Sequence, residues 1–481
     1  MTADFIGSGE EGRAGWWRRR GVRALALASA LSLVAALAAC SGGGSDRSAA
    51  AGGAADSARR PDSGAADGGT ADGGTSAAAR AACAPDNGGI TLPSGFCATI
   101  FADSVGGARH VAVAPNGDVF VQLITARKGA ESGSGQTGGV LALRDTNGDG
   151  KADTSAVFGE VGGTGIGLHD GYLYADDKSR IVRWRLPAGS LTPEGSAQTI
   201  VSGLPTGGHE ARNFVIDDAG NLYVNVGSRT NSCQVKDRVN RSPGIDPCTE
   251  LQTRAGIWKF ASDRGGQTQK SAQRFATGVR NAMGLTISPL DGKIYTTQHG
   301  RDQLTQNWGF PAPAGAANPA EELMQVSAGD DFGWPYCFYD LEQKKLVLAP
   351  EYGGDGKQVG RCAHKKSPLT VFPGHWAPMS SLFYSGTQFP ARYRGGVFVA
   401  FHGSWNRAPE PQDGYRLAFV PMANGQPSGD FETFADGFAG ATKQPDAAAH
   451  RPVGLAQAPD GSIYVTDDKG GRIWKVVYRG R

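Results

Sequence analysis

Short apolar runs that flank a glycine turn recur along the chain from residue 111 onward. In the clearest copy, residues 214–216 and 222–224 are apolar or aromatic, and a polar Asp-Ala-Gly-Asn turn lies between them. This alternation is typical of two antiparallel strands joined by a tight turn. The turn glycines of successive copies are 54, 49, 72, 104 and 65 residues apart, at Gly117, Gly171, Gly220, Gly292, Gly396 and Gly461.

Repeats of this kind predict a β-propeller. Units of roughly 40 to 50 residues, each a small sheet that cannot bury both faces alone, are typical of its blades. We predict an all-β fold, a six-bladed β-propeller over residues 83–481, closed by a strand at 97–101 that completes the last blade. The 104-residue interval predicts a long insertion within 301–380 rather than a seventh blade. The alternative, a β-sandwich, does not repeat an Asp-Gly hairpin at such intervals.

The N-terminal 82 residues have a different composition. Residues 1–40 contain several arginines and then an apolar run at 24–39, which predicts an export signal peptide. The ending Leu-Ala-Ala-Cys40 resembles a lipoprotein cleavage box, and we favour a lipidated Cys40 over ordinary secretion. Residues 41–82 are mostly Gly, Ala, Ser and Asp, so they bury little and predict a disordered linker. We therefore expect an exported lipoprotein, periplasmic or at the cell surface, held to the membrane only by this anchor.

The net charge bears on possible partners, and the cysteine content bears on disulfides. The net charge is +2, from 48 basic and 46 acidic residues, which gives no electrostatic reason to expect nucleic acid as a partner. Six of the seven cysteines follow the linker, an even number that suggests disulfides in an exported chain. Sequence alone allows 15 connectivities. Pairing nearest neighbours predicts Cys83–Cys97, Cys233–Cys248 and Cys337–Cys362.

A polar cluster at residues 209–213 leads directly into the strand predicted at 214–216. His209 stands first, and an imidazole with an ordinary pKa near 6.5 suits general-base chemistry at neutral pH. The alternative is a structural histidine that bonds a loop carbonyl. Arg212 and Asn213 follow closely, and a cation and an amide beside the imidazole favour a polar pocket.

The same Arg-Asn pair recurs as Arg280-Asn281, again before a predicted strand, and Arg407 and Arg451 stand near two further blades. Arginine binds carboxylates with a fixed, bidentate geometry, so these side chains could hold an anionic polycarboxylate in the central cavity. The alternative is that the arginines tie neighbouring blades together through backbone carbonyls. We predict a cofactor-binding role for Arg212, Asn213, Asn281, Arg407 and Arg451.

Residues 145–153 resemble a calcium loop, with oxygen-bearing side chains in alternation and a glycine at the sixth position. The twelfth position is Ala156, which cannot supply the bidentate carboxylate of an EF-hand. A structural calcium ion and a metal-free Asp/Gly turn therefore both stay open. The candidate ligands are Asp145, Asn147, Asp149 and Asp153.

Several motifs in order resemble the soluble quinoprotein glucose/sorbosone dehydrogenase family, and within it the pyranose dehydrogenases that use pyrroloquinoline quinone (PQQ). The resemblance covers about residues 90–480. It rests on Leu92-Pro-x-Gly-Phe96, Gly208-His209-x-x-Arg212-Asn213, Val279-Arg280-Asn281-x-x-Gly284, His299-Gly300-Arg301-Asp302, Glu321-Glu322, Gly329-Asp-Asp-Phe-Gly-Trp-Pro335, Phe401-His402-Gly403-Ser404-Trp405 and His450-Arg451-Pro452.

The resemblance implies a propeller that holds PQQ and Ca²⁺ in its central cavity. It implies that His209 is the general base, and that Arg280 and Asn281 lie at the reactive carbonyl of the quinone. Arg451 and Arg407 match positions that bind the cofactor. Gly300 and Arg301 match two residues whose backbone carbonyls bind calcium. The glucose dehydrogenases have proline in place of Arg301 and an acidic residue in place of Gly208, and the second departure argues against glucose specificity.

The function implied is PQQ-dependent oxidation of a sugar, an aldose, a pyranose or a sorbosone-like aldehyde, by hydride transfer to the quinone. No Cys-x-x-Cys-His occurs that would attach a c-type haem, so the electrons would pass to an external acceptor, a cytochrome or a quinone. Two other functions stay open. One is a calcium-dependent lactonase of propeller fold, and the other is a non-catalytic propeller that binds a glycan or a protein.

Overall fold

The computed structural model describes residues 83–124, 138–160 and 162–480. The predicted signal peptide at 1–40 with its lipidated Cys40, and the predicted linker at 41–82, lie outside the described residues. Within them, no helix is long and apolar enough to cross a membrane.

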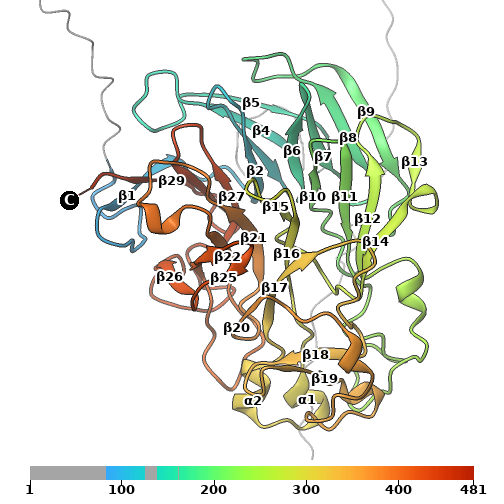
Figure 1. The fold of residues 1–481 in the computed structure, drawn as a ribbon. Coiled ribbons are helices and arrows are strands. Elements are labelled where there is room, and N and C mark those ends of the chain that lie inside the picture. The colour runs from blue at the N-terminus through green and yellow to red at the C-terminus, as the bar shows by residue number, and fades with distance from the viewer. Residues whose placement is uncertain (1–82, 125–137, 161, 481) are drawn as a thin grey trace, which may run out of the picture. The chain divides into compact units, whose positions relative to one another are not determined.

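The described residues form six antiparallel blades (Figure 1). Blade 1 contains β2 (Ala108–Val113), β3 (Val119–Leu123), β4 (Gly139–Arg144) and β5 (Thr154–Phe158). Blade 2 contains β6 (Ile166–His169), β7 (Tyr172–Asp176), β8 (Ile181–Arg185), β9 (Glu194–Ser202) and, at its outer edge, β13 (Gln267–Thr268). Blade 3 contains β10 (Phe214–Ile216), β11 (Asn221–Val226), β12 (Gly256–Ala261) and β14 (Gln273–Thr277).

The remaining blades follow the same order. Blade 4 contains β15 (Thr286–Ile287), β16 (Ile294–Gln298), β17 (Glu321–Val326) and β20 (Thr370–Phe372). Blade 5 contains β21 (Pro378–Phe383), β22 (Val397–Phe401), β23 (Arg416–Val420) and β26 (Glu432–Ala435). Blade 6 contains β27 (Pro452–Gln457), β28 (Ile463–Asp467), β29 (Ile473–Tyr478) and β1 (Phe96–Ala102). The six-bladed propeller predicted from the hairpin repeats is thereby confirmed.

The first strands of the blades form the inner ring. β2, β6, β10, β15, β21 and β27 each lie at one edge of a sheet and contact one another around a closed circle. Because the first four strands of every blade form an antiparallel meander, the connection into the first strand and the connection between the second and third strands lie on the same face. We call this the entrance face. Its segments include residues 203–213, 227–255, 278–285, 299–320, 402–415 and 468–472.

The core lies between the blades rather than inside any one of them. Each neighbouring pair encloses a buried apolar cluster, because the strands present apolar side chains on both faces. In the middle strand β22, for example, every residue is buried. Burying one large apolar side chain contributes about 1.5–3 kcal/mol, so it is the contact between blades that stabilises each small sheet.

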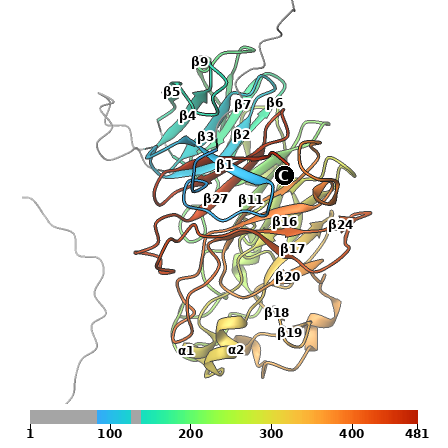
Figure 2. The same cartoon turned by 90° about the vertical axis from the view of Figure 1, so that its left-hand side faces the viewer.

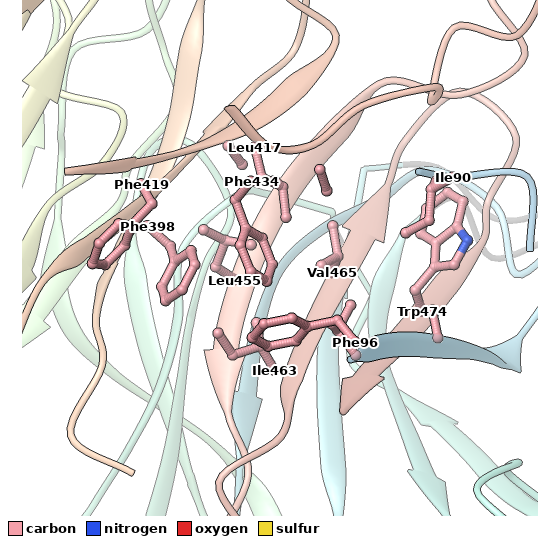
Figure 3. Close-up of a cluster of buried hydrophobic side chains, with 14 of the residues drawn as sticks. Ile90, Phe96, Phe398, Leu417, Phe419, Phe434, Leu455, Ile463, Val465 and Trp474 are labelled. Atoms are coloured by element: carbon pink, nitrogen blue, oxygen red, sulfur yellow. The ribbon is translucent and has the colours of Figure 1, made fainter. Parts of the chain in front are cut away.

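The strand that closes the ring comes from the N-terminal end of the domain, as predicted. β1 pairs antiparallel with β29, with Phe96 opposite Tyr478. The Phe96 ring packs edge-on against Phe389, at 4.7 Å between centroids, and against Phe434, at 5.0 Å. Figure 3 shows Phe96 reaching from β1 into the cluster that also contains Phe434 and Ile463. The predicted Cys83–Cys97 disulfide ties the start of this strand.

The long interval in blade 4 holds an insertion, also as predicted. α1 (Leu304–Trp308) and α2 (Ala312–Ala317) lie between β16 and β17, and β18 (Cys337–Asp340) and β19 (Lys345–Leu348) lie between β17 and β20. Both cartoons show these four elements gathered beyond one end of blade 4 (Figures 1 and 2). Minor elements complete the described residues: η1 (Thr249–Gln252), η2 (Gln269–Ser271), η3 (Pro350–Tyr352), η4 (Gly360–His364), η5 (Ala391–Tyr393), β24 (Met422–Ala423) and β25 (Gln426–Pro427).

Candidate active site on the entrance face

His209 lies in the segment that leads into β10, and its contacts fix which ring nitrogen is basic. Its Nδ1 lies 2.9 Å from the backbone oxygen of Ser228 and 3.0 Å from Ser228 Oγ. A carbonyl oxygen only accepts, so Nδ1 carries the proton. Ser228 Oγ donates its own hydrogen to the oxygen of Thr230 at 2.7 Å, and therefore also acts as an acceptor. The basic nitrogen is Nε2, which has no hydrogen-bond partner among the described residues.

The surroundings of His209 keep the ring neutral. Burial, and then the positive charge of Arg280, lower the pKa of His209 to about 3. An imidazole with this pKa is unprotonated at any physiological pH. His209 can therefore accept a proton at Nε2 without first having to lose one.

Two glycines, Gly208 and Gly227, leave room for the backbone and the side chain of His209. Gly208 has a φ of +72°, and a Cβ there would collide with the backbone of Arg229, so no acidic side chain fits at this position. Gly227 follows β11, and a Cβ there would lie 2.6 Å from His209 Cβ and 3.0 Å from Asn281 Oδ1. The absence of a side chain at Gly227 thus brings His209 and Asn281 close together.

Arg280 approaches the same centre from blade 4. The guanidinium is buried, donates to the backbone oxygen and to Oδ1 of Asn231, both at 3.1 Å, and forms an ion pair with Asp302 at 3.2 Å. Nη1 donates only to the backbone oxygen of His299 at 3.4 Å, so it keeps an N–H group without a partner among the described residues. The adjacent Asn281 accepts a hydrogen bond at Oδ1 from Asn225 at 3.2 Å. Both predicted blade 4 residues therefore lie at the site.

Asp302 joins three segments of the entrance face, and the sequence did not single it out as a functional residue. Besides Arg280, its carboxylate accepts from Arg238 at 2.7 Å and from Asn406 at 2.5 Å. Burial opposes ionisation, but the guanidiniums of Arg280 and Arg238 hold its pKa well below the usual range. Its partners are 64 and 104 residues away in sequence. The only local signal was its position directly after Arg301 in a motif of the family.

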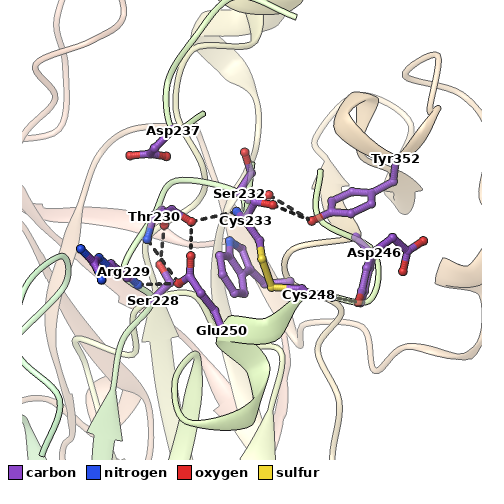
Figure 4. Close-up of a disulfide and its surroundings, with 12 residues drawn as sticks. Ser228, Arg229, Thr230, Ser232, Cys233, Asp237, Asp246, Cys248, Glu250 and Tyr352 are labelled. Carbon is purple, nitrogen blue, oxygen red and sulfur yellow. Dashed lines mark hydrogen bonds between the residues drawn. A yellow bond between two sulfur atoms is a disulfide. The ribbon is translucent and has the colours of Figure 1, made fainter. Parts of the chain in front are cut away.

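A disulfide shapes the blade 3 segment that supplies Asn231 and Arg238. Cys233–Cys248, one of the predicted pairs, closes a 15-residue loop between β11 and β12 (Figure 4). Thr230 in the same segment bonds the carboxylate of Glu250, and Tyr352 donates to the oxygen of Ser232 at 3.2 Å. The third predicted disulfide, Cys337–Cys362, also forms, within the blade 4 insertion. Closing such loops removes conformational freedom from the unfolded chain.

Arg212 and Asn213 donate to backbone oxygens of neighbouring segments. The Arg212 side chain is 0% exposed and donates to the backbone oxygens of Lys178, at 2.9 Å, His209, at 3.2 Å, and Pro205. Asn213 donates to the backbone oxygens of Ala282 and Met283 in blade 4. Both side chains are buried, and Oδ1 of Asn213 has no hydrogen-bond partner among the described residues. These contacts support the alternative of blade-to-blade ties, and a cofactor-binding role for this pair stays a prediction.

Arg451 and Arg407 each donate to backbone oxygens and keep one guanidinium nitrogen without a hydrogen-bond partner among the described residues. Arg451 donates to the backbone oxygens of His402 at 2.9 Å and Gly403 at 2.7 Å, and its Nη1 has no partner among the described residues. Arg407 donates to the backbone oxygens of Pro411, at 2.9 Å, and Ala316, at 2.6 Å, and its Nη2 is similarly unpartnered within the described residues. A cofactor-binding role for these two arginines stays a prediction.

Gly300 and Arg301 lie on the connection from β16 to β17, and this connection passes beside Arg280. Their backbone oxygens accept no hydrogen bond from the described residues. The Arg301 side chain faces the insertion instead, where it forms a 2.6 Å ion pair with Glu351, the two side chains being 3% and 0% exposed. Glu351 also accepts from Ser232 at 2.9 Å and from Trp308 at 2.9 Å. The side chain of Arg301 thus anchors the insertion, and its backbone oxygen accepts no hydrogen bond from the described residues.

Apolar side chains from several blades gather next to this polar layer and form an apolar floor for it. Met283, Met379 and Val453 form one buried cluster, with Ala211 packed against it. They come from blades 4, 5 and 6 and from the blade 3 entrance. A site above such a floor excludes water on that side, which strengthens the electrostatic interactions within it.

The 145–153 loop lies at the opposite end of blade 1, between β4 and β5. Asp145 accepts backbone hydrogen bonds from Gly148 at 2.7 Å and Gly150 at 2.8 Å, and Asp153 accepts one from Thr146 at 3.0 Å. Asn147 and Asp149 likewise bond amides of the loop, each at 2.8 Å. In the part of the chain that the structure describes, no group of three His, Cys, Asp or Glu could hold a metal ion. A structural calcium ion and a turn without metal both stay predictions for this loop.

Comparisons with known proteins agree with this geometry. The chain matches the family described as TrAA12-like over residues 90–479. It is 25% identical over 434 residues to a pyrroloquinoline quinone-dependent pyranose dehydrogenase of Coprinopsis cinerea, covering 81% of this chain and 53% of that protein. It is also 29% identical over 298 residues to an uncharacterized protein of Borreliella burgdorferi, covering 61% and 65% of the two chains. The chain thus spans between about half and two thirds of the length of these curated relatives.

Solved structures show the same fold. The calcium structure of the Trichoderma reesei family AA12 protein superposes with a TM-score of 0.66 at 18% identity, covering 81% of this chain and 97% of that one. The holo form of the PQQ domain of pyranose dehydrogenase from Coprinopsis cinerea gives 0.64 at 19% identity, with 81% and 97% covered. At these identities the likeness concerns the fold alone. The family match spans all six blades and confirms the resemblance drawn from the motifs, so the chain belongs to the TrAA12-like family.

Proposed function

We propose that this protein is a PQQ-dependent sugar dehydrogenase that oxidises an aldose, a pyranose or a sorbosone-like aldehyde and passes the electrons to an external cytochrome or quinone. One observation carries the proposal: a neutral imidazole, His209, presents a free Nε2 at a centre where Arg280 keeps an unpartnered N–H. The names of the relatives support the substrate class and the cofactor, since one is a PQQ-dependent pyranose dehydrogenase and another an aldose sugar dehydrogenase of Escherichia coli.

The residues present fit the implied cofactor and its calcium ion. The backbone oxygens of Gly300 and Arg301 accept no hydrogen bond from the described residues, and carbonyl oxygens are the ligands that Ca²⁺ prefers. Arg280 and Asn281 would hold the cofactor at its reactive carbonyl, and the unpartnered edges of Arg407 and Arg451 suit its carboxylates. PQQ, when bound, supplies an electrophilic quinone that accepts two electrons from the substrate carbon.

The chain itself supplies orientation and proton transfer. The Ser228 backbone oxygen and hydroxyl hold the His209 ring with Nε2 outward, and Nε2 takes the proton from the sugar hydroxyl. Asp302 holds the guanidinium of Arg280 in place through the 3.2 Å ion pair. The apolar floor of Met283, Met379 and Val453 keeps water from one side of the site. Each of these tasks is set by contacts within this chain.

The test is the dye-linked oxidation of an aldose panel by protein loaded with PQQ and Ca²⁺, comparing wild type with His209→Gln. We expect kcat to fall by about 10²–10⁴-fold, the range for loss of a positioned general base. The matched control is His169→Gln, at the end of β6 far from the entrance face, which should retain wild-type activity. Full activity of His209→Gln would refute the assignment.

The pH profile gives a second check on the same residue. Because the pKa of His209 is lowered to about 3, the base stays unprotonated as the pH falls from about 8 to about 5. We therefore expect kcat/KM to show no acid limb with a midpoint near the ordinary histidine value of about 6.5. Such a limb, if it vanished in His209→Gln, would show that the base has an unshifted pKa.

The other two functions are outcomes of the same assay. Lactone hydrolysis without dye reduction would favour a lactonase, and no turnover of sugar or lactone would favour a binding propeller.

Export is part of the proposal, since disulfides persist in oxidising compartments and all three predicted pairs form. Lipidation at Cys40 would be seen as a mass shift and membrane association that Cys40→Ser abolishes.

A further inference from the structure

A second histidine on the entrance face is held by a carboxylate, and the proposed reaction gives it no role. His402 Nε2 lies 2.7 Å from Asp468 Oδ1, and Arg109 Nη1 lies 2.7 Å from Asp468 Oδ2. Arg109 also donates to Thr164 Oγ1, at 3.4 Å from Nε and 3.3 Å from Nη2. His402 follows β22, Asp468 follows β28 and Arg109 lies on β2, so the group joins blades 5, 6 and 1.

The protonation of this group follows from its partners. Each oxygen of Asp468 receives one donor, and His402 and Arg109 together hold the pKa of Asp468 well below the usual range, against the effect of burial. Since an ionised carboxylate only accepts, His402 Nε2 carries the proton. Nδ1 is then the basic nitrogen, and it has no partner among the described residues. His402 therefore presents a free acceptor, as His209 does at Nε2.

The backbone of His402 is held by two hydrogen bonds, and its side chain is partly exposed. Its backbone nitrogen donates to the oxygen of Ala377 at 2.9 Å, and its backbone oxygen accepts from Arg451 at 2.9 Å. Its side chain is 16% exposed, so the ring is accessible despite these bonds. His299 Nε2 lies 3.0 Å from the backbone oxygen of Pro378, the residue after Ala377, and the His299 backbone nitrogen donates to the oxygen of Asn281 at 3.2 Å, so His299 links the His402 segment to the Arg280-Asn281 segment.

We infer that His402 is a substrate-binding residue that deepens the proposed function: its Nδ1 accepts a hydrogen bond from a sugar hydroxyl other than the one that His209 deprotonates. This inference rests on the sugar dehydrogenase activity proposed above. Asp468 and Arg109 are positioning residues, because they fix the tautomer and the direction of the ring. No covalent bond changes at His402. The ligand recognised is a polyol that offers two hydroxyl donors to two imidazoles held in opposite tautomers.

Two substitutions at His402 separate a substrate contact from a structural tie. His402→Phe removes both nitrogens, whereas His402→Asn keeps an acceptor near the position of Nδ1 and loses the Nε2 bond to Asp468. We expect His402→Phe to raise KM about 10- to 100-fold with kcat within about threefold, as for an unpaired polar contact. His402→Asn should recover most of that loss. The measurement uses D-glucose, D-galactose and D-mannose with enzyme loaded with PQQ and Ca²⁺, and His169→Gln is the control.

Deoxy sugars and NMR complete the design. On the monodeoxy analogue that lacks the recognised hydroxyl, wild type and His402→Phe should have the same KM, because the contact is already absent. In PQQ-free protein, ¹⁵N spectra of the histidine rings should show His402 with its proton on Nε2, and the best sugar of the panel should shift its Nδ1 signal. Asp468→Asn should reduce the preference for this tautomer.

Several results would overturn the inference. Equal losses in His402→Phe and His402→Asn with a lowered melting temperature would mean that His402 only ties blades 5 and 6. A fall in kcat as large as that of His209→Gln would make His402 a base rather than a binding residue. Failure of the proposed function looks different: wild type would oxidise no sugar of the panel, and no sugar would shift the ¹⁵N signals of either histidine.

Discussion

The same two residues, Arg-Asn, open blade 3 and blade 4, and the structure uses the pairs in different ways. Arg212 is fully buried and donates only to the backbone oxygens of Lys178, His209 and Pro205. Arg280 is also buried, but it pairs with the carboxylate of Asp302 and keeps an N–H free. One arginine is part of the scaffold and the other is part of the site.

The difference lies in what the neighbouring segments offer. Around Arg212 the hydrogen-bond acceptors are carbonyl oxygens, and burial lowers the pKa of its guanidinium to about 10, although the nearby carboxylates of Asp176 and Glu210 act in the opposite direction. Around Arg280 the segment that leads into the disulfide loop of blade 3 supplies Asn231, and the next connection of blade 4 supplies Asp302. An arginine held by a carboxylate keeps its direction and its charge toward the cavity. The motif alone does not distinguish the two cases.

Arg212→Met should give the largest effect, and on stability. The substitution leaves three partly buried backbone oxygens without these donors, and each costs about 1 kcal/mol, the lower end of the range for an unsatisfied group, so we expect a loss of about 3 kcal/mol of unfolding free energy. Urea denaturation measures it, and kcat of the folded fraction should stay within about tenfold, because Arg212 holds the His209 loop only through its backbone. Arg185→Met, at an exposed arginine of β8, is the control and should change stability by less than about 0.5 kcal/mol.

Arg280→Gln should reverse that pattern. It removes the group that would face the reacting atoms, so we expect kcat to fall about 10²–10³-fold, the range for loss of one stabilising donor. Asp302 keeps Arg238 and Asn406 as partners, so the loss of stability should be smaller than for Arg212→Met. Arg280→Lys, which keeps the charge without the planar fork, should lie between wild type and Arg280→Gln. If Arg280→Gln unfolded the protein while Arg212→Met inactivated it, the two assignments would have to be exchanged.

The features that the sequence predicted correctly are local. Each hairpin needs only a strand, a turn and a strand within a short stretch, so six turn glycines were enough to count the blades. The disulfides also close short loops, of 14, 15 and 25 residues, which is why pairing nearest neighbours succeeded. The closing strand β1 follows from the need of the last blade for a fourth strand.

The features that the sequence could not predict depend on segments far apart in the chain. Asp302 acquires its role only when Arg238 and Asn406 fold onto it, from 64 and 104 residues away. His402 likewise depends on Asp468, 66 residues later, and on Arg109, 359 residues from Asp468. No periodicity or local motif carries such information, and for the same reason the sequence could not tell Arg212 from Arg280.

Ser228→Ala should have the smallest effect and tests how blade 3 serves the site. Alanine removes Oγ but keeps the backbone oxygen that accepts from His209 at 2.9 Å, so the tautomer with Nε2 unprotonated should persist. We expect kcat to fall about three- to tenfold, in line with the loss of one neutral hydrogen bond of about 1 kcal/mol. Because the Ser228 backbone nitrogen donates to the oxygen of Arg280 at 2.8 Å, the two residues are in contact, and the double variant with Arg280→Gln should depart from the product of the two single losses. A loss of kcat for Ser228→Ala as large as for His209→Gln would mean that the hydroxyl, rather than the backbone oxygen, sets the tautomer of His209. Proton transfer would then depend on His209 and Ser228 together rather than on His209 alone.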